Sequence, residues 1–371
     1  MSVLDSIVVN LSTLAIAEKA DFLRRFCIVS DGKSNITEGK CEMVTAENWK
    51  TKVTGNDEIS KALTSFFINA VGKPAYVFEA GSSGNTQAKL KKLEAFIDGA
   101  TLPCYEYLLP ASLYADAYLS TLLEKYVKDE QAIYFSANLN ASAQADPTQQ
   151  TEYNNWKGKK SFMGVYPTIS DTNLNTAGLI LGVKASSVFD ISTAKRMSSL
   201  EYKYCGSSSK ILESSIFTKN YEAPCVFTAS KGTRNEIRNS KMADGKFWHY
   251  RYSLDTLVSM LKSNIDALFS NASNVVNGAL QYNDAGIQSI KQNLISTLQT
   301  AKQMGIVNRF AQSIDIATNE LTGINDLASI PFEEYKNANP KDYANGVYGG
   351  YSGYVEIMNF IVKIEFNATL G

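Results

Sequence analysis

The chain has few of the residues that most catalytic and metal sites need. It holds one histidine, His249, among 371 residues. A two-histidine metal site and a facial triad are therefore excluded, since both need a second imidazole. As a lone general base, His249 would need a nucleophile or carboxylate that the sequence does not place beside it. Because it is flanked by Trp248 and Tyr250, we expect a half-buried member of an aromatic cluster.

Cysteine is also sparse and widely spaced. The five cysteines are never closer than fourteen residues apart, and no C-x-x-C pair occurs. A zinc ribbon is therefore not expected. The spacing predicts buried or reduced thiols in a cytosolic chain. No residue is assigned to a metal or a cofactor.

The chain lacks an excess of either charge and any long apolar run. Lys and Arg number 36 and Asp and Glu 37, for a net charge of -1. No basic field would attract nucleic acid or a membrane surface. No run approaches the ~18 apolar residues of a membrane span, and the first ten residues do not resemble a signal peptide. We expect a soluble protein made in the cytoplasm.

Sequence motifs for phosphate or calcium are missing as well. The Gly-Ser-Ser-Gly segment at residues 81–84 lies between an expected strand and an expected helix, where an anion-binding loop belongs. It matches neither GxxxxGK[ST] nor GxGxxG, which favours a short turn. The acids Asp315, Glu320 and Asp326 lack calcium-loop spacing. No catalytic residue is assigned, and we expect no enzyme.

What is present is a regular alternation of strands and helices between residues 24 and 137. Strands are expected at 25–29, 75–79 and 132–135, and helices around 59–70, 90–97 and 119–127. Such alternation predicts an α/β layered core. Residues 138–152 are expected to form a loop, 161–166 a strand, and 185–245 an irregular polar region.

Two amphipathic helices are expected in the last third. Apolar residues at helical spacing mark 254–269, with Ser253 as the N-cap. A second helix covers 287–304 and ends at Gly305. A strand-rich segment follows at 306–323. Tyrosine, with twenty copies, suits contact surfaces as well as cores.

Strand-like segments occur at both ends of the chain, at residues 6–12 and 359–369. Each lies outside the nearest helical pattern, so each is an unpaired edge. Such ends favour polymerisation by strand exchange between neighbouring copies.

Several local sequences resemble the sheath protein of contractile phage tails and related injection systems. They occur in the family's order along the chain: VVNLS at 8–12, Phe22 with the strand 26–29, the helix 56–70 before KPAYV at 73–77, YNDAGI at 282–287, NPKDYA at 339–344, GGYSG at 349–353 and IEFN at 364–367. The resemblance is thin from about 140 to 245, a region that varies within the family.

The resemblance implies an α/β (α+β) sheath fold with an inserted domain. A conserved domain would comprise 23–137 and 246–345, and a variable outer domain 138–245. An N-terminal arm (1–22) and a C-terminal arm (346–371) would pair with neighbouring subunits. The implied strand residues are Ile7, Val8, Val9, Asn10, Leu11, Phe360, Val362, Ile364 and Phe366; the implied hinge residues are Gly346, Gly349, Gly350 and Gly353.

The resemblance also implies a function without a cofactor. Six-fold rings would stack helically around a tail tube and contract to drive it through a host envelope. The implied partners are further copies of the chain, the tube protein, and baseplate and terminator proteins, in a virion assembled in the host cytoplasm. Two alternatives stay open: another tail component such as a tube or baseplate subunit, and an α/β enzyme such as a hydrolase.

Overall fold

The chain divides into two compact units. The computed structural model describes residues 22–55, 57–100, 103–128, 133–139, 146–147, 151–188, 198–231, 234–274 and 280–359. The described part of the larger unit runs from residue 22 to 188 and from 198 to 251, and that of the smaller unit from 252 to 359. The division falls within one long helix, α9 (Trp248–Asn274).

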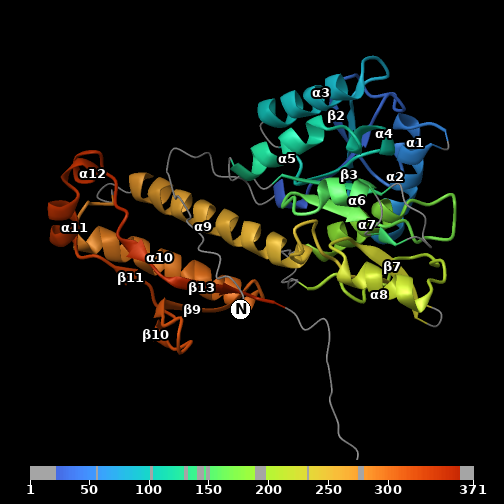
Figure 1. The fold of residues 1–371 in the computed structure, drawn as a ribbon. Coiled ribbons are helices and arrows are strands. Elements are labelled where there is room, and N and C mark those ends of the chain that lie inside the picture. Colours follow the sequence, from blue (N-terminus) through green and yellow to red (C-terminus); the bar gives the residue numbers. More distant parts are fainter. Residues whose placement is uncertain are drawn as a thin grey trace, which may run out of the picture. The chain divides into compact units, whose positions relative to one another are not determined.

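A six-stranded sheet forms the centre of the larger unit (Figure 1), in the order β2-β3-β1-β4-β5-β6. All neighbours are parallel except the edge strand β2, which runs antiparallel to β3. A separate hairpin pairs β7 with β8. The strands are β1 (Phe26–Ser30), β2 (Cys41–Val44), β3 (Ala75–Glu79), β4 (Glu106–Leu108), β5 (Tyr134–Asn138), β6 (Phe162–Val165), β7 (Phe227–Lys231) and β8 (Arg234–Arg238).

Helices cover both faces of this sheet. On one face, Phe96 of α3 packs on Phe78, and Tyr126 of α5 packs on Phe135. On the other face, α2 contacts β1, and α7 contacts β4 and β5. The expected α/β architecture is confirmed. The helical elements are η1 (Phe22–Arg24), α1 (Trp49–Lys52), α2 (Glu58–Asn69), α3 (Thr86–Gly99), α4 (Ala111–Tyr114), α5 (Tyr118–Lys128), α6 (Thr151–Trp156), α7 (Thr176–Ser187) and α8 (Ser214–Glu222).

The helices α2 and α7 pack with their backbones close together. A Cβ at Gly178 would lie 2.5 Å from the carbonyl oxygen of Ala62, and one at Gly182 would lie 2.3 Å from that of Phe66. The two glycines are four residues apart in α7, and the two residues they approach are four apart in α2, so each pair lies on one face of its helix. Larger side chains at the two glycines would push the helices apart.

A buried ion pair joins α7 to the middle of the sheet. Lys184 Nζ donates to Glu106 Oε1 at 2.6 Å, and each side chain is 1% exposed. The ammonium also lies 5.4 Å from the ring centre of Trp248. Burial lowers the pKa of Lys184, and the carboxylate of Glu106 opposes that shift. The pair therefore compensates two charges that would be costly alone.

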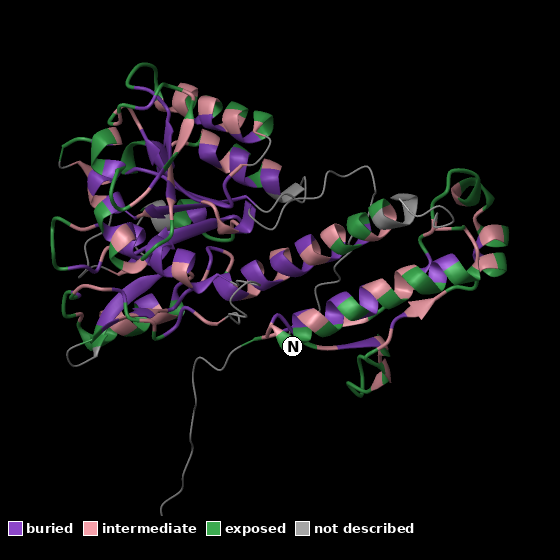
Figure 2. Cartoon of the chain, turned by 180° about the vertical axis from the view of Figure 1, so that it is seen from behind, coloured by how far each residue is buried: buried purple, intermediate pink, exposed green. Residues whose placement is uncertain are grey.

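The smaller unit combines helices with a three-stranded antiparallel sheet in the order β10-β9-β13. The helix α10 packs against β9, and buried residues recur along one side of α10 (Figure 2). A short pair, β11 with β12, comes between β10 and β13 in sequence and forms a separate two-stranded ladder. The remaining elements are α10 (Asp284–Gln303), β9 (Val307–Ile314), β10 (Leu321–Ile324), β11 (Ala328–Ser329), α11 (Phe332–Ala338), α12 (Pro340–Ala344), β12 (Tyr351–Ser352) and β13 (Tyr354–Ile357).

The ends of the two long helices test the capping predictions. The prediction that Ser253 caps the first helix is wrong, because α9 begins at Trp248. Trp248 and Tyr252, one turn apart and both buried, extend the apolar stripe toward the N-terminus. The predicted end of the second helix is confirmed: Gly305 follows α10 with φ +72°. The amides of Gly305 and Ile306 donate to Lys302 and Ala301, as in a Schellman motif.

The expected domain boundaries do not coincide with the boundaries of the compact units. Strand β6 completes the sheet begun by residues 26–30, although 138–245 was expected to be inserted as a separate domain. Residues 252–345 lie in the smaller unit, whereas residues 23–137 lie in the larger unit. The assignment of conserved and variable parts concerns the family and the assembly, and it stays a prediction.

The ion pair gives a test of the fold. Replacing Lys184 with Met should lower the free energy of unfolding by about 3–5 kcal/mol, because Glu106 is left buried without its partner. The double variant Lys184→Met/Glu106→Leu should recover most of that loss. Urea unfolding measures both. Lys159→Met, which breaks the more exposed pair with Glu124, is the control and should cost less than about 1 kcal/mol. Equal losses for the two lysines would contradict this account.

Candidate assembly site

The residues predicted to form the assembly arms are only partly described. Ile7, Val8, Val9, Asn10 and Leu11 lie outside the described residues. The same holds for the four predicted strand residues near the C-terminus, namely Phe360, Val362, Ile364 and Phe366. The described part of the C-terminal arm is 346–359. It contains the four glycines, β12 and β13, and it forms the described part of the candidate assembly site.

Gly346 ends the helix α12. Its φ is +70°, a backbone conformation that glycine reaches without strain. Its amide donates to Tyr343, and the amide of Val347 donates to Asp342 at 2.8 Å. These two bonds form a Schellman motif, which satisfies carbonyls at the helix end.

The other three glycines are needed for close packing. A Cβ at Gly349 would lie 3.0 Å from Tyr335 Oη, and one at Gly350 would lie 2.6 Å from Tyr348. At Gly353 it would lie 2.4 Å from Leu327 Cδ2. Each glycine therefore has a local reason that does not involve bending, and the hinge role stays a prediction.

An aromatic cluster surrounds this glycine-rich segment. Ring centres of contacting members lie 4.6–6.2 Å apart, and every such pair is tilted or edge-to-face. The cluster joins the start of α10, the helices α11 and α12, and the arm. Its members are Tyr282, Phe332, Tyr335, Tyr343, Tyr348 and Tyr351.

The tyrosine hydroxyls fix the arm by hydrogen bonds to the backbone. Tyr282 donates to the carbonyl of Val347 at 2.5 Å, and Tyr351 donates to that of Ile287 at 2.8 Å. Tyr335 donates to Asp342 and accepts the amide of Gly349. Burial raises the pKa of Tyr351, so its hydroxyl stays a donor at neutral pH. The first part of the arm is thus bound to the smaller unit.

The strand β13 carries the arm to the edge of the three-stranded sheet. It pairs with β9 on one side, and among the described strands none pairs with its other side. Glu356 accepts from Arg309 Nε at 2.5 Å, from Asn308 at 2.5 Å and from Tyr354 at 3.0 Å. Burial acts to raise the pKa of Glu356, but these donors hold it below its usual value.

The candidates for chemistry that the sequence offered are occupied by structural contacts. His249 is fully buried, where a half-buried residue was expected, and stacks on Phe247 at 5.3 Å. In the loop 81–84, the amide of Gly81 donates to Glu79, so this part of an anion cradle is taken. Asp326 pairs with Lys291 at 3.1 Å. One surface hollow at the starts of α3 and α5 has a single carboxylate, Asp116, in its lining.

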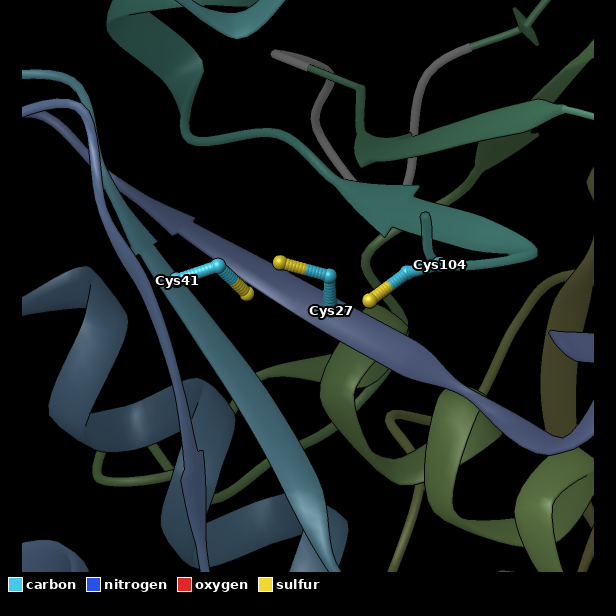
Figure 3. A group of neighbouring side chains, drawn as sticks. All are labelled: Cys27, Cys41 and Cys104. Atoms are coloured by element: carbon cyan, nitrogen blue, oxygen red, sulfur yellow. The ribbon is translucent and has the colours of Figure 1, made fainter. Parts of the chain in front are cut away.

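One cluster was not expected from the sequence. The sulfur atoms of Cys27, Cys41 and Cys104 all lie within 4.8 Å of one another (Figure 3). Cys27 is in β1, Cys41 begins the edge strand β2, and Cys104 precedes β4. They are brought together by the strand order β2-β3-β1-β4, which spacing along the chain does not reveal.

Among the described helices, none combines the length and the hydropathy that crossing a bilayer requires.

Comparison with solved structures matches the chain over its whole length. A chain of the anti-feeding prophage baseplate matches with a TM-score of 0.64 at 12% identity, covering 100% of this chain and 99% of that one. The sheath complex of an extracellular contractile injection system, PVC, in its contracted state matches with a TM-score of 0.62 at 10% identity, covering 100% and 96%. The chain has the sheath fold.

A third structure with this fold is the sheath tail protein of Desulfitobacterium hafniense. It matches with a TM-score of 0.55 at 11% identity and covers 82% of this chain and 89% of that one. No protein-family model matches the chain, and no curated protein matches it in sequence. The chain is therefore similar to these sheath structures in fold, at a sequence identity of only 10–12%.

The Glu356 network predicts a stability difference that depends on pH. Because the folded-state pKa of Glu356 is lowered, its contribution is complete above the ordinary glutamate pKa of about 4.3 and is lost as pH falls through the folded value. Glu356→Gln should lower the free energy of unfolding by about 1 kcal/mol at pH 7, with little difference left near the folded pKa. Denaturant unfolding at several pH values measures it. The exposed Glu320→Gln should show no such trend; a constant deficit for Glu356→Gln would count against the assignment.

Proposed function

We propose that the chain is the structural subunit of a contractile sheath. It polymerises as six-fold rings stacked in a helix around a tail tube, and contraction of the lattice drives the tube through a host envelope. The observation that carries the proposal is the extent of the fold match. The match covers 100% of this chain and 96–99% of three chains from contractile systems, with TM-scores of 0.60–0.64.

The partners follow from this role. The subunit binds further copies of itself, the tube protein that it surrounds, and baseplate and terminator proteins at the two ends of the sheath. It belongs to a virion tail or a related injection system and is assembled in the host cytoplasm. In this assembly, residues 138–245 supply the variable, outward-facing part.

The arms are proposed to connect the subunits. Residues 6–12 and 359–369 add strands to a neighbour's sheet through main-chain hydrogen bonds. The position of β13 at the edge of its sheet supports this, because the chain continues from this edge into the predicted arm strand. During contraction the arms stay paired, the glycines of 346–353 absorb the bending, and the globular parts repack.

The energy of contraction is stored in the extended lattice, so the subunit needs neither nucleotide nor cofactor. Three observations support a structural role over a hydrolase. The amide of Gly81 is hydrogen-bonded to Glu79, His249 is buried against Phe247, and the surface hollow has one carboxylate, Asp116, in its lining. General acid–base hydrolysis of a glycan would need a pair of carboxylates.

A second candidate is a baseplate subunit that shares the sheath fold. It is favoured by the matches to two anti-feeding prophage baseplate structures, with TM-scores of 0.64 and 0.54. Negative-stain electron microscopy of the concentrated chain separates the two. A sheath subunit should form hollow striated cylinders with a lumen wide enough for a tube, whereas a baseplate subunit should form discrete rings without stacking.

Deleting residues 2–13 should abolish cylinder formation and leave a folded monomer, because the N-terminal strand can no longer pair with a neighbour. Electron microscopy reports assembly, and circular dichroism with analytical ultracentrifugation reports folding and mass. Cylinders formed by the deletion variant would contradict the role of the N-terminal arm.

Ile364→Pro should have the same effect at the other end, because proline removes a donor from the strand ladder. The control is Ile364→Thr, which keeps the amide and should still assemble. An unfolded Ile364→Pro variant would instead assign the last strand to the subunit's own core.

A further inference from the structure

The three clustered thiols have no role in the proposed assembly. Cys27 and Cys104 are buried, and Cys41 is partly exposed at the sheet edge. Their sulfurs converge from three separate segments (Figure 3). The two other cysteines, Cys205 and Cys225, are buried singly in the same unit. The convergence is therefore a property of this corner of the sheet.

A positive charge lies beside the thiols. The guanidinium of Arg25 stacks over the ring of Tyr76 at 4.2 Å, and it interacts with the thiol of Cys104. Its Nε is buried and makes no hydrogen bond, and among the described residues no carboxylate pairs with Arg25. A half-buried guanidinium without a carboxylate needs another anion. Thiolate sulfur is the anion that this site can supply.

The separation of the sulfurs fits a metal centre. With zinc–sulfur bonds of about 2.3 Å and tetrahedral angles, ligand sulfurs lie about 3.8 Å apart. The three sulfur atoms lie within 4.8 Å of one another, so each pair would have to approach by about 1 Å at most to reach this separation. The partly exposed Cys41 gives a route from solvent, and the hydroxyl of Tyr107 accepts the Cys104 amide at 2.9 Å next to the cluster.

Charge favours Zn²⁺ over a monovalent soft ion. Three thiolates, one Zn²⁺ and the Arg25 guanidinium sum to zero, whereas Cu⁺ would leave one negative charge in a largely buried site. We propose that Cys27, Cys41 and Cys104 bind one zinc ion, with a water molecule from the exposed side as the fourth ligand. The ion would connect the edge strand β2 to the central strand β1 and to the segment before β4.

Metal binding by the full-length chain tests this directly. The protein is reduced, freed of metal with a chelator and titrated with Zn²⁺ against a chromophoric competitor, and Co²⁺ is used as a spectroscopic probe. We expect one ion per chain, thiolate-to-cobalt charge-transfer bands, a zinc-dependent rise in the thermal midpoint, and slower alkylation of Cys41 when zinc is present.

Cys41→Ser is the informative variant, because its position at the edge makes it the least disruptive to folding. It should weaken zinc affinity at least about 100-fold and remove the zinc-dependent rise in the thermal midpoint. Arg25→Gln should weaken affinity about 10-fold without changing the number of sulfur ligands seen in the cobalt spectrum. Cys225→Ser is the matched control and should bind zinc as the unaltered chain does.

Three results would overturn the proposal. They are a reduced chain that binds no zinc at micromolar concentration, equal affinity in Cys41→Ser and Cys225→Ser, and a stable disulfide within the cluster that persists under mild reduction. None of these results bears on cylinder formation, so the zinc site and the sheath function fail independently.

Discussion

The buried pair of Lys184 and Glu106 is the constraint on which much of the larger unit depends. It fixes α7 over β4, a central strand of the sheet, and it places the start of α9 by the contact with Trp248. An uncompensated charge at either position would cost several kcal/mol, so α7 has one register on the sheet. The same register brings Gly178 and Gly182 onto the backbone of α2. This polar contact and the close glycine packing thus fix the position of α7 together.

The sequence allowed the regular parts of this unit to be predicted. The strand at 75–79 and the helices α2, α3 and α5 follow hydrophobic patterns, and the structure contains them near the expected bounds. The helix α7 was missed because it is apolar on nearly every side and holds two glycines, a pattern without a helical period. Strand β4 was missed because it has three residues and begins with an acid whose partner comes 78 residues later.

The functional features divide in the same way. The aromatic cluster at the arm could be suspected from the number of tyrosines, yet its hydrogen bonds depend on how α10, α11 and α12 meet. The resemblance to the sheath family implied a hinge at the glycines of 346–353, while their packing against Tyr335, Tyr348 and Leu327 depends on tertiary contacts. The thiol cluster could not be predicted, because only the order of strands brings its members together.

The late position of Lys184 in the chain has a consequence for synthesis in the cell. At roughly 5–20 residues per second, Glu106 leaves the ribosome about 4 to 16 seconds before Lys184 does. All six strands of the sheet, β1 to β6, precede α7 in sequence, so until α7 has been made the sheet face that it will cover is open to water and to other nascent chains. We expect the polysome-bound chain to be most prone to aggregation in this interval, and a chaperone that binds apolar surface to protect it until α7 has been made.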